Sequence, residues 1–191
     1  LKDLETVEKI TAKKEVSRES EVFKKVKEFL ESGKILSEQK SKYSNEEIKI
    51  INQYQLLTMK PRLYLLNGKD AEVPKNITEE FQKNSWPFSI IDVSAESEMD
   101  VLIKKAYEIL GLLTFFTTGP DETRAWTIKK GQKAPQAGGV IHSDFESHFI
   151  KAEVINWQDL LRAGGFARAR EKGLIRTEGK EYLVQDGDVI E

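Results

Sequence analysis

Hydrophobic spacing changes twice along this sequence, and these two changes constrain the fold more than any other feature. Up to about residue 58, apolar residues recur three and four positions apart, the spacing of amphipathic helices. Between residues 59 and 111, short apolar runs alternate with helical stretches, and from residue 112 short runs are separated by turns rich in Gly and Pro. We therefore predict three segments, 1–58, 59–111 and 112–191, in a mixed fold with α/β and α+β parts.

The first segment, 1–58, is expected to be a helical hairpin of the coiled-coil kind. One apolar stripe runs through residues 22–30, with Lys and Glu at the positions between. Gly33 is typical of a helix end, and Ser44 with Glu47 has the spacing of a capping box that starts another helix. The segment contains no catalytic pattern, so we expect it to set the reach and orientation of the rest.

The second segment, 59–111, is expected to be a parallel α/β unit. Two apolar runs, 62–66 and 88–93, suit buried parallel strands, and a helix is expected from about residue 97 to residue 110. The expected inner face of that helix consists of Val101, Leu102, Ala106, Ile109 and Leu110. Two strands are too few for a stable sheet, so we expect this segment to be the end of a larger domain.

The third segment, 112–191, is expected to form a small α+β roll of the ubiquitin-like kind. Helices are predicted to start at Ala134-Pro135, where Pro takes a favoured first position, and near Trp157. Strands are predicted at 113–118, 123–130, 149–155, 181–184 and 189–190.

Polar turns follow both predicted parallel strands, and ligands of open α/β sheets bind at that edge. An Asn side chain there can contact a base, an Asp carboxylate can accept two hydrogen bonds from guanine, and a Ser-Ala turn can offer a backbone N–H. The alternative for each motif alone is an ordinary turn. We predict a purine-base site formed by Asn67, Gly68, Asp70, Ser94, Ala95 and Glu96.

The motif G-x-x-x-x-G-K-[ST] does not occur in this sequence. Without the backbone N–H groups, the Lys and the Mg²⁺ ligands of such a loop, phosphoryl transfer has no machinery. We therefore expect no catalytic residue and no tight nucleotide binding by this chain alone. The absence of Cys and the presence of only two His also argue against Cys-based or histidine-rich metal sites.

A local basic region lies in the third segment, although the formal net charge of the chain is −2. Cationic side chains beside an aromatic side chain on one strand can hold RNA phosphates and stack a base. We predict RNA contacts from Arg124, Trp126, Lys129, Lys130, Lys133 and His142. The alternative, which we prefer for Trp126, is a core position with solvated lysines around it.

The run His142-Ser143-Asp144 contains the residue types of a hydrolase triad. Triads are assembled by the fold from separate positions, and three consecutive residues rarely reach the required geometry. We expect His142 instead to end a helix and to bond its last carbonyls.

Many stretches of the third segment resemble the TGS domain of the YchF/Obg-like ATPases. They are Phe115-Phe-Thr-Thr-Gly119, Arg124-Ala-Trp-Thr-Ile-Lys-Lys-Gly131, Ala134-Pro-Gln-Ala137, Ile141-His-Ser-Asp-Phe-Glu146, Phe149-Ile-Lys-Ala-Glu-Val154 and Val184-Gln-Asp-Gly-Asp-Val189. Upstream, residues 3–9 resemble the start of the family's helical hairpin, and residues 56–61 resemble its return into the nucleotide-binding domain.

The resemblance implies a P-loop protein of the translation-factor class, with a coiled-coil insertion, a β-grasp TGS domain and an association with ribosomes. Residues 59–111 would then be the last part of the P-loop NTPase domain, with Asn67 contacting the base and 94–96 forming the last nucleotide loop. The full-length protein would bind ATP or GTP with Mg²⁺. Many members prefer ATP and have Glu at the position of Asp70, whereas Asp reads guanine in ordinary GTPases.

Two functional hypotheses from different classes follow. In the first, the chain docks on the ribosome or on ribosomal RNA through its basic TGS strand, and its binding weakens with salt. In the second, it is a regulatory protein–protein module that uses the apolar stripe of the hairpin and the TGS face. We expect a cytoplasmic location and no membrane partner, because no apolar run could span a bilayer and no signal peptide is visible.

Overall fold

The chain folds into two compact units, 1–63 and 64–191, which we call the helical unit and the sheet unit. The structure is a computed structural model that describes residues 2–12, 17–95, 99–119 and 121–191. Over those residues, no helix is long and apolar enough to cross a membrane. Each unit has hydrophobic core clusters of its own, so each is described by itself.

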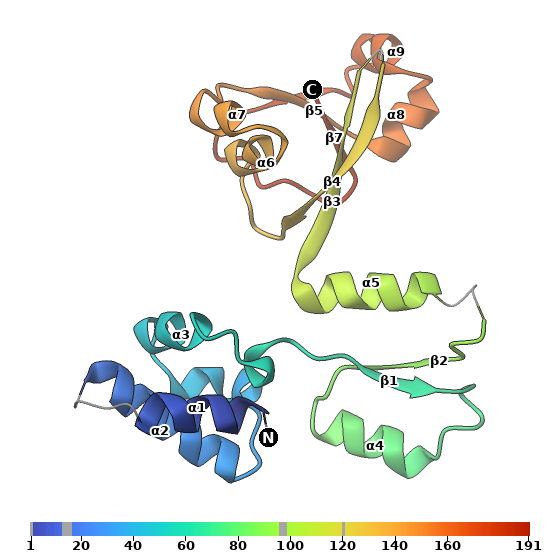
Figure 1. The fold of residues 1–191 in the computed structure, drawn as a ribbon. Helices are drawn as coiled ribbons and strands as arrows, with labels where there is room; N and C mark the ends of the chain where they lie inside the picture. Colours follow the sequence, from blue (N-terminus) through green and yellow to red (C-terminus); the bar gives the residue numbers. More distant parts are fainter. Residues whose placement is uncertain (1, 13–16, 96–98, 120) are drawn as a thin grey trace. The chain divides into compact units, whose positions relative to one another are not determined.

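Helices make up the regular structure of the helical unit (Figure 1). The apolar stripe predicted from the sequence lies on the second helix, where Val22, Phe23 and Val26 are at most 3% exposed. These side chains pack against Val7 and Ile51 from other helices, so the stripe forms the core of this unit. In order, the elements are α1 (Lys2–Ala12), α2 (Arg18–Glu31), the 3-10 segment η1 (Leu36–Lys42), α3 (Asn45–Asn52) and η2 (Leu57–Met59).

Both helix boundaries predicted here are confirmed. Gly33, with φ of +70°, follows α2, and the adjacent Lys34 N–H donates to the Phe29 carbonyl as the chain turns away. At the start of α3, the Ser44 hydroxyl accepts from the Glu47 N–H and the Glu47 carboxylate accepts from the Ser44 N–H. This reciprocal pair is the predicted capping box.

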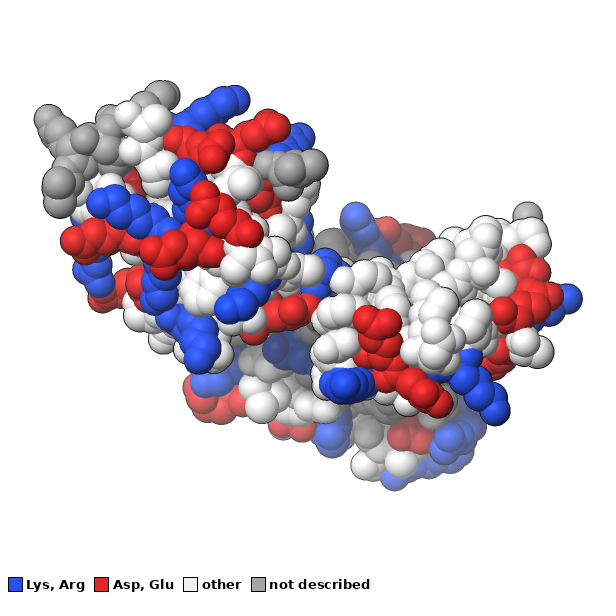
Figure 2. Space-filling view, turned by 90° about the horizontal axis from the view of Figure 1, so that it is seen from below, with Lys and Arg blue, Asp and Glu red and all other residues white. Residues whose placement is uncertain are grey.

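Charges of both signs alternate over the face of the helical unit seen in Figure 2. Lys25 pairs with Glu47 at 3.3 Å, and Lys27 lies 3.6 Å from both Glu8 and Glu31. A surface of alternating, paired charges has little long-range attraction for a polyanion. This face of the helical unit is therefore a poor surface for RNA.

The sheet unit begins with two parallel strands, as the sequence predicted. Strand β1 (Tyr64–Asn67) pairs in parallel with β2 (Phe88–Ile91), and α4 (Lys75–Lys83) connects them. The ring of Phe81 on α4 lies 4.9 Å from Tyr64 and 5.5 Å from Trp86, in edge contacts that hold the helix on the strands.

Helix α5 (Met99–Leu110) follows β2, but its expected inner face is partly wrong. Leu102, Ala106 and Ile109 are half-buried, whereas Val101 and Leu110 are 53% and 49% exposed. A two-stranded sheet offers too little apolar surface to cover a whole helical face.

The second half of the sheet unit is a mixed five-stranded sheet in the order β4-β3-β7-β5-β6. Strands β3 and β7, the first and the last of this sheet in the sequence, are adjacent and parallel. The other pairings in the sheet are antiparallel. The strands are β3 (Leu112–Thr118), β4 (Thr123–Lys129), β5 (Ala152–Asn156), β6 (Arg176–Glu178) and β7 (Asp188–Ile190).

Helices cover both faces of this sheet (Figure 1). On one face, Leu113 and Phe115 of β3 pack with Ala134 and Ala137 of α6 (Ala134–Ile141), which is followed by α7 (Ser143–Ser147). On the other face, Phe116 packs in the cluster that includes α8 (Trp157–Ala163) and α9 (Phe166–Glu171). The period-two alternation along β3 thus divides its side chains between two cores.

Two strand predictions in this region are wrong in part. Residues 181–184 form no strand and make only an isolated bridge between Leu183 and Lys133, because Tyr182 turns inward to bond Asp188. The strand predicted at 149–155 begins only at Ala152, and Ile150 before it is 80% exposed. Strand β6, which is short and polar, was not predicted.

Candidate functional site

The two predicted base-reading turns lie at the same edge of the β1–β2 pair, because Asn67 and Ile91 are register partners. The Asn67 Oδ1 accepts a hydrogen bond from the Val93 N–H at 3.2 Å, so this side chain braces the turn after β2. Gly68 has φ of +140°, a conformation that side chains rarely adopt. Its N–H donates to the Ile91 carbonyl at 3.1 Å, which ties the first turn to β2.

The turn after β2 is held by its own hydrogen bonds. The Ser94 N–H and hydroxyl both donate to Asp92 Oδ1, and these bonds hold the pKa of Asp92 below its usual range. The Ala95 N–H donates to the Asp92 carbonyl at 2.9 Å. The backbone donors of Ser94 and Ala95 are therefore engaged inside the turn, and Glu96 lies outside the described residues.

Asp70 is exposed in the turn after β1. Among the described residues, none donates a hydrogen bond to its carboxylate, whereas the neighbouring Lys69 N–H is bonded to Glu72 at 3.1 Å. The structure thus brings Asn67, Gly68, Asp70 and Ser94 to one edge, with Asn67 bracing and Asp70 open to a ligand.

The predicted RNA-contacting residues divide between the two faces of the edge strand β4. Arg124 and Trp126 lie on the α6 face, with the Arg124 guanidinium 4.2 Å from the centre of the Trp126 indole. Trp126 is half-buried, packs on the core and donates from Nε1 to the Thr117 hydroxyl at 2.9 Å. Lys129 is paired in register with Leu112, which places it on the opposite face.

The other predicted RNA-contacting residues, Lys130, Lys133 and His142, lie outside strand β4. Lys133 forms an ion pair with Glu181. His142 ends α6, as expected, but its ring bonds differently: Nδ1 accepts from the Asp144 N–H at 3.3 Å and so caps α7. Its backbone N–H, rather than its ring, donates to the Gly138 carbonyl. Between the two helices His142 has an extended backbone conformation, with φ of −158° and ψ of 140°.

Lys130, directly after β4, lines a cleft that was not predictable from the sequence. This cleft, which we call the α5 cleft, has a volume of about 540 Å³ and lies between α5, the second face of β3 and the start of α8. Lys104, Tyr107 and Trp157 also line it. The relevant signal in the sequence was that the aromatic residue Trp157 directly follows strand β5. An ordinary core residue can have the same position, so this signal does not identify a cleft.

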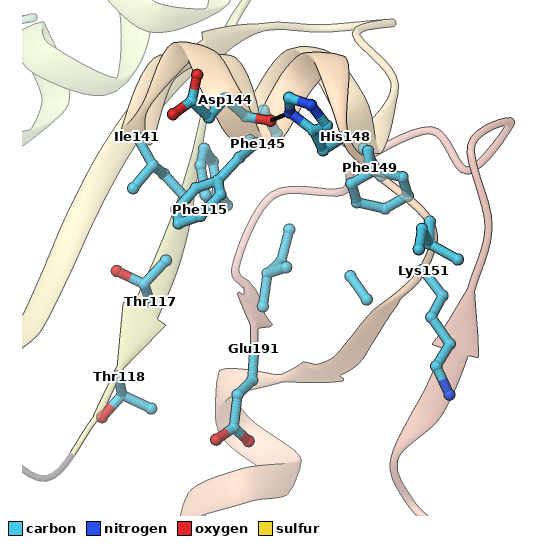
Figure 3. Close-up of a pocket in the computed structure, with 16 residues that line it drawn as sticks. Phe115, Thr117, Thr118, Ile141, Asp144, Phe145, His148, Phe149, Lys151 and Glu191 are labelled. Carbon is cyan, nitrogen blue, oxygen red and sulfur yellow. Dashed lines mark hydrogen bonds between the residues drawn. The ribbon is translucent and has the colours of Figure 1, made fainter.

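A larger groove of about 680 Å³ lies on the α6 face (Figure 3). Phe115, Ile141, Phe145 and Phe149 provide apolar walls, and Phe145 is 54% exposed. Asp144 and Glu191 add carboxylates, whereas Lys151 is the one cation among the lining residues. Such a surface suits apolar groups of a protein and disfavours phosphate.

The side chains that could act as metal ligands do not cluster in the described part of the chain. No group of three or more His, Cys, Asp or Glu side chains is placed to hold a metal ion there. Mg²⁺ in proteins is commonly held by one or two carboxylates together with substrate phosphates. The residues that would provide such ligands were expected in a phosphate loop, which this sequence lacks.

The comparisons with known proteins agree with one another, because each finds proteins named YchF or Obg-like ATPase. Residues 112–191 match the family model YchF-GTPase_C, described as "Protein of unknown function (DUF933)". The whole chain is 40% identical to the ribosome-binding ATPase YchF of Bacillus subtilis, of which it covers 62%. Over 98% of its length it is 38% identical to Obg-like ATPase 1 of Xenopus laevis, of which it covers 56%.

One solved structure supports the fold. The YchF GTPase of Schizosaccharomyces pombe aligns over all of this chain with a TM-score of 0.69 and 32% sequence identity. The alignment covers 60% of that protein. This chain therefore spans about 60% of the length of these three relatives.

Proposed function

Because this chain belongs to the YchF/Obg-like ATPase family, we propose that it is the ribosome- and RNA-docking part of a nucleotide-binding protein linked to translation. The Bacillus subtilis relative is named a ribosome-binding ATPase. Ribosome docking also places the protein in the cytoplasm.

Exposed cations around the edge strand β4 are the observation that carries this proposal. Arg124, Lys129 and Lys130 are all exposed, and β4 ends the sheet, so a large partner can reach them. Lys129 and Lys130 have no carboxylate within ion-pair distance among the described residues. Such free cations release counterions when they bind phosphates, which drives association with RNA even though the whole chain is nearly neutral.

Three domains complete the proposal: a helical coiled-coil hairpin at 1–58, the last part of a P-loop NTPase domain at 59–111, and a β-grasp TGS domain at 112–191. The parallel pair β1–β2 supports the second assignment. The third is supported by a mixed sheet in which β3 and β7 are adjacent and parallel while α6 covers one face.

Nucleotide recognition belongs to the full-length protein, where we propose that ATP or GTP binds with Mg²⁺. Asn67, Gly68, Asp70, Ser94, Ala95 and Glu96 would contact the base. Without phosphate contacts the affinity of this chain for nucleotide should be poor, and it should not hydrolyse. Isothermal titration with ATP and GTP tests this point, and a submicromolar Kd for either one would contradict it.

Co-sedimentation with purified ribosomal subunits at low salt tests docking. We expect the chain to pellet with ribosomes, and a variant with Arg124→Ala, Lys129→Ala and Lys130→Ala to remain mostly in the supernatant. A control with three exposed lysines of the helical unit changed to Ala has the same net charge. It should behave like the unmodified chain; equal losses in both variants would mean that only overall charge matters.

A second candidate function, a protein–protein module, is favoured by the apolar groove on the α6 face. Phe145 and Ile150 at this groove are 54% and 80% exposed. The stripe of the hairpin is less accessible, because Val22, Phe23 and Val26 are buried in the helical unit and Phe29 and Leu30 are half-buried. Ribosome binding that is lost in an Ile150→Asp variant and kept in the triple Ala variant would favour this function.

A further inference from the structure

The α5 cleft combines an exposed aromatic ring with two free cations. Trp157, the first residue of α8, is 43% exposed and lines the cleft together with Tyr107 of α5. Lys104 of α5 and Lys130 after β4 line it as well. We propose that this cleft binds a nucleotide of single-stranded RNA, with its base stacked on Trp157 and its phosphates held by Lys104 and Lys130. This inference rests on the proposed function, which supplies the RNA.

The indole of Trp157 packs against the turn that contains Gly187. The backbone N–H of Trp157 donates to the Gly187 carbonyl at 2.9 Å, and the backbone N–H of Gly187 donates to the Thr114 carbonyl at 2.8 Å. A Cβ on Gly187 would lie 2.6 Å from Trp157 Cδ1, so the ring lies directly against this glycine. Contact with the Gly187 backbone restricts the ring, so it loses less conformational entropy when a base stacks on it.

The two lysines of the cleft are free, whereas its carboxylates are engaged. Among the described residues, no carboxylate lies within ion-pair distance of Lys104 or Lys130. Glu108 is paired with Lys105 at 3.0 Å, and Asp186 accepts a hydrogen bond from the Thr114 N–H at 2.8 Å. Unpaired ammonium groups on the rim favour an anionic ligand such as a phosphate backbone.

The walls of the cleft are fixed relative to one another at two points. The Tyr107 hydroxyl and the Thr127 hydroxyl are 3.1 Å apart, which joins α5 to β4. The Lys130 N–H donates to the Gly111 carbonyl at 2.8 Å, just where α5 passes into β3. Lys129 lies on this face of β4 too, so the phosphates on either side of a stacked base could contact it.

Single-stranded RNA fits this arrangement better than a duplex. A base can stack on an indole only when it is free of its own neighbours, and in a duplex each base is already stacked. Stacking on an aromatic ring also tolerates any base, because every base has a π-face. The cleft should therefore prefer unpaired RNA without a strong sequence preference.

Fluorescence anisotropy with a labelled, unstructured RNA 12-mer and the same RNA as a duplex tests the inference. We expect Trp157→Leu to weaken single-strand binding by about fivefold or more and to change duplex binding little. Lys104→Ala should reduce the slope of log K against log salt by about 1. Lys75→Ala on α4, a change of equal charge at an exposed lysine, should leave affinity unchanged.

A second readout does not depend on variant stability. RNA should quench tryptophan emission of the unmodified chain, and Trp157→Phe should remove most of that quenching while keeping a stacking surface. Unchanged affinity in Trp157→Leu together with unchanged quenching in Trp157→Phe, with ribosome co-sedimentation intact, would contradict RNA binding in the cleft and leave the proposed function standing. If the unmodified chain pellets with neither ribosomal subunit, both the proposed function and RNA binding in the cleft are contradicted.

Discussion

Single buried carboxylates tie together segments that are far apart in the sequence. Asp3 is 7% exposed and accepts hydrogen bonds from the Leu57 N–H, the Thr58 N–H and the Thr58 hydroxyl, at 2.6–2.9 Å. It thereby joins α1 to η2, the last element of the helical unit. Burial alone would raise the pKa of Asp3, but the hydrogen bonds from Thr58 and Leu57 outweigh it and hold the pKa below its usual range.

Asp3→Asn should destabilise the helical unit by about 1–3 kcal/mol, because buried N–H donors lose a charged acceptor. The folded pKa is lowered, so the stabilising contribution is fully present above the unfolded pKa and is lost as pH falls through the folded pKa. Urea unfolding followed by circular dichroism at pH 7 and pH 3 should show a smaller difference between the two proteins at pH 3. A difference independent of pH would contradict this account.

Asp188 plays the corresponding role in the sheet unit, where it is 2% exposed. Its Oδ2 accepts from the Tyr182 hydroxyl at 2.7 Å and from the Gln185 N–H at 2.8 Å, and Arg176 lies 3.6 Å from Oδ1. Burial, followed by the bond to Asp188, raises the pKa of Tyr182 to about 12.

Asp188→Ala should therefore cost about 2–3 kcal/mol, since a buried donor and a cation lose their acceptor, while Tyr182→Phe should cost about 1 kcal/mol. Thermal unfolding followed by tryptophan emission measures both. Equal losses would mean that the bond between Tyr182 and Asp188 dominates and that Gln185 and Arg176 contribute nothing.

At the scale of elements, the sequence predicted the helices and strands whose hydrophobic spacing matches the period of a helix or a strand. Strands β3 and β4, the parallel pair β1–β2 and the capped start of α3 all have such patterns. Strand β6 could not be predicted, because Arg176-Thr177-Glu178 has no apolar alternation and pairs only through its backbone with β5. Residues 181–184 have the right alternation but form no strand.

The candidate site was predictable only where a turn follows a strand. Asn67 and Asp70 come together at one edge because Asn67 ends β1 and Asp70 lies in the turn after it, a position that the sequence itself indicates. The basic residues divide between the two faces of β4 because successive side chains of a strand point to opposite faces, which the sequence indicates. Lys104 and Trp157, in contrast, come near Lys130 only because α5 and α8 pack on the sheet. Such contacts between distant segments have no local signal in one sequence.

The capping box of α3 gives a prediction at this scale. Ser44→Ala removes the hydroxyl that accepts from the Glu47 N–H and should destabilise the helical unit by about 1 kcal/mol. Ser32→Ala, which removes only a bond to the Phe29 carbonyl at the exposed end of α2, should cost less. Urea unfolding by circular dichroism measures both, and a larger loss for Ser32→Ala would contradict the role of the box.

At the scale of the whole molecule, charge is balanced overall but unevenly distributed. The formal net charge is −2, and several cations of the helical unit are paired with carboxylates. On one face of the sheet unit, by contrast, Lys104, Lys129 and Lys130 have no ion-pair partner among the residues that the structure describes. Docking on RNA therefore depends on a few local phosphate contacts rather than on long-range attraction. Removing those few lysines should have a large effect on a nearly neutral protein.

The salt dependence of binding to ribosomal subunits, measured by co-sedimentation without nucleotide, tests the docking claim most directly. With three free lysines in contact with phosphates, log K should fall linearly with log salt with a slope of about −2 or steeper. Adding ATP or GTP with Mg²⁺ should leave the curve unchanged, because this chain lacks the phosphate loop. Binding that is insensitive to salt, or none at the lowest salt, would contradict RNA docking by this chain.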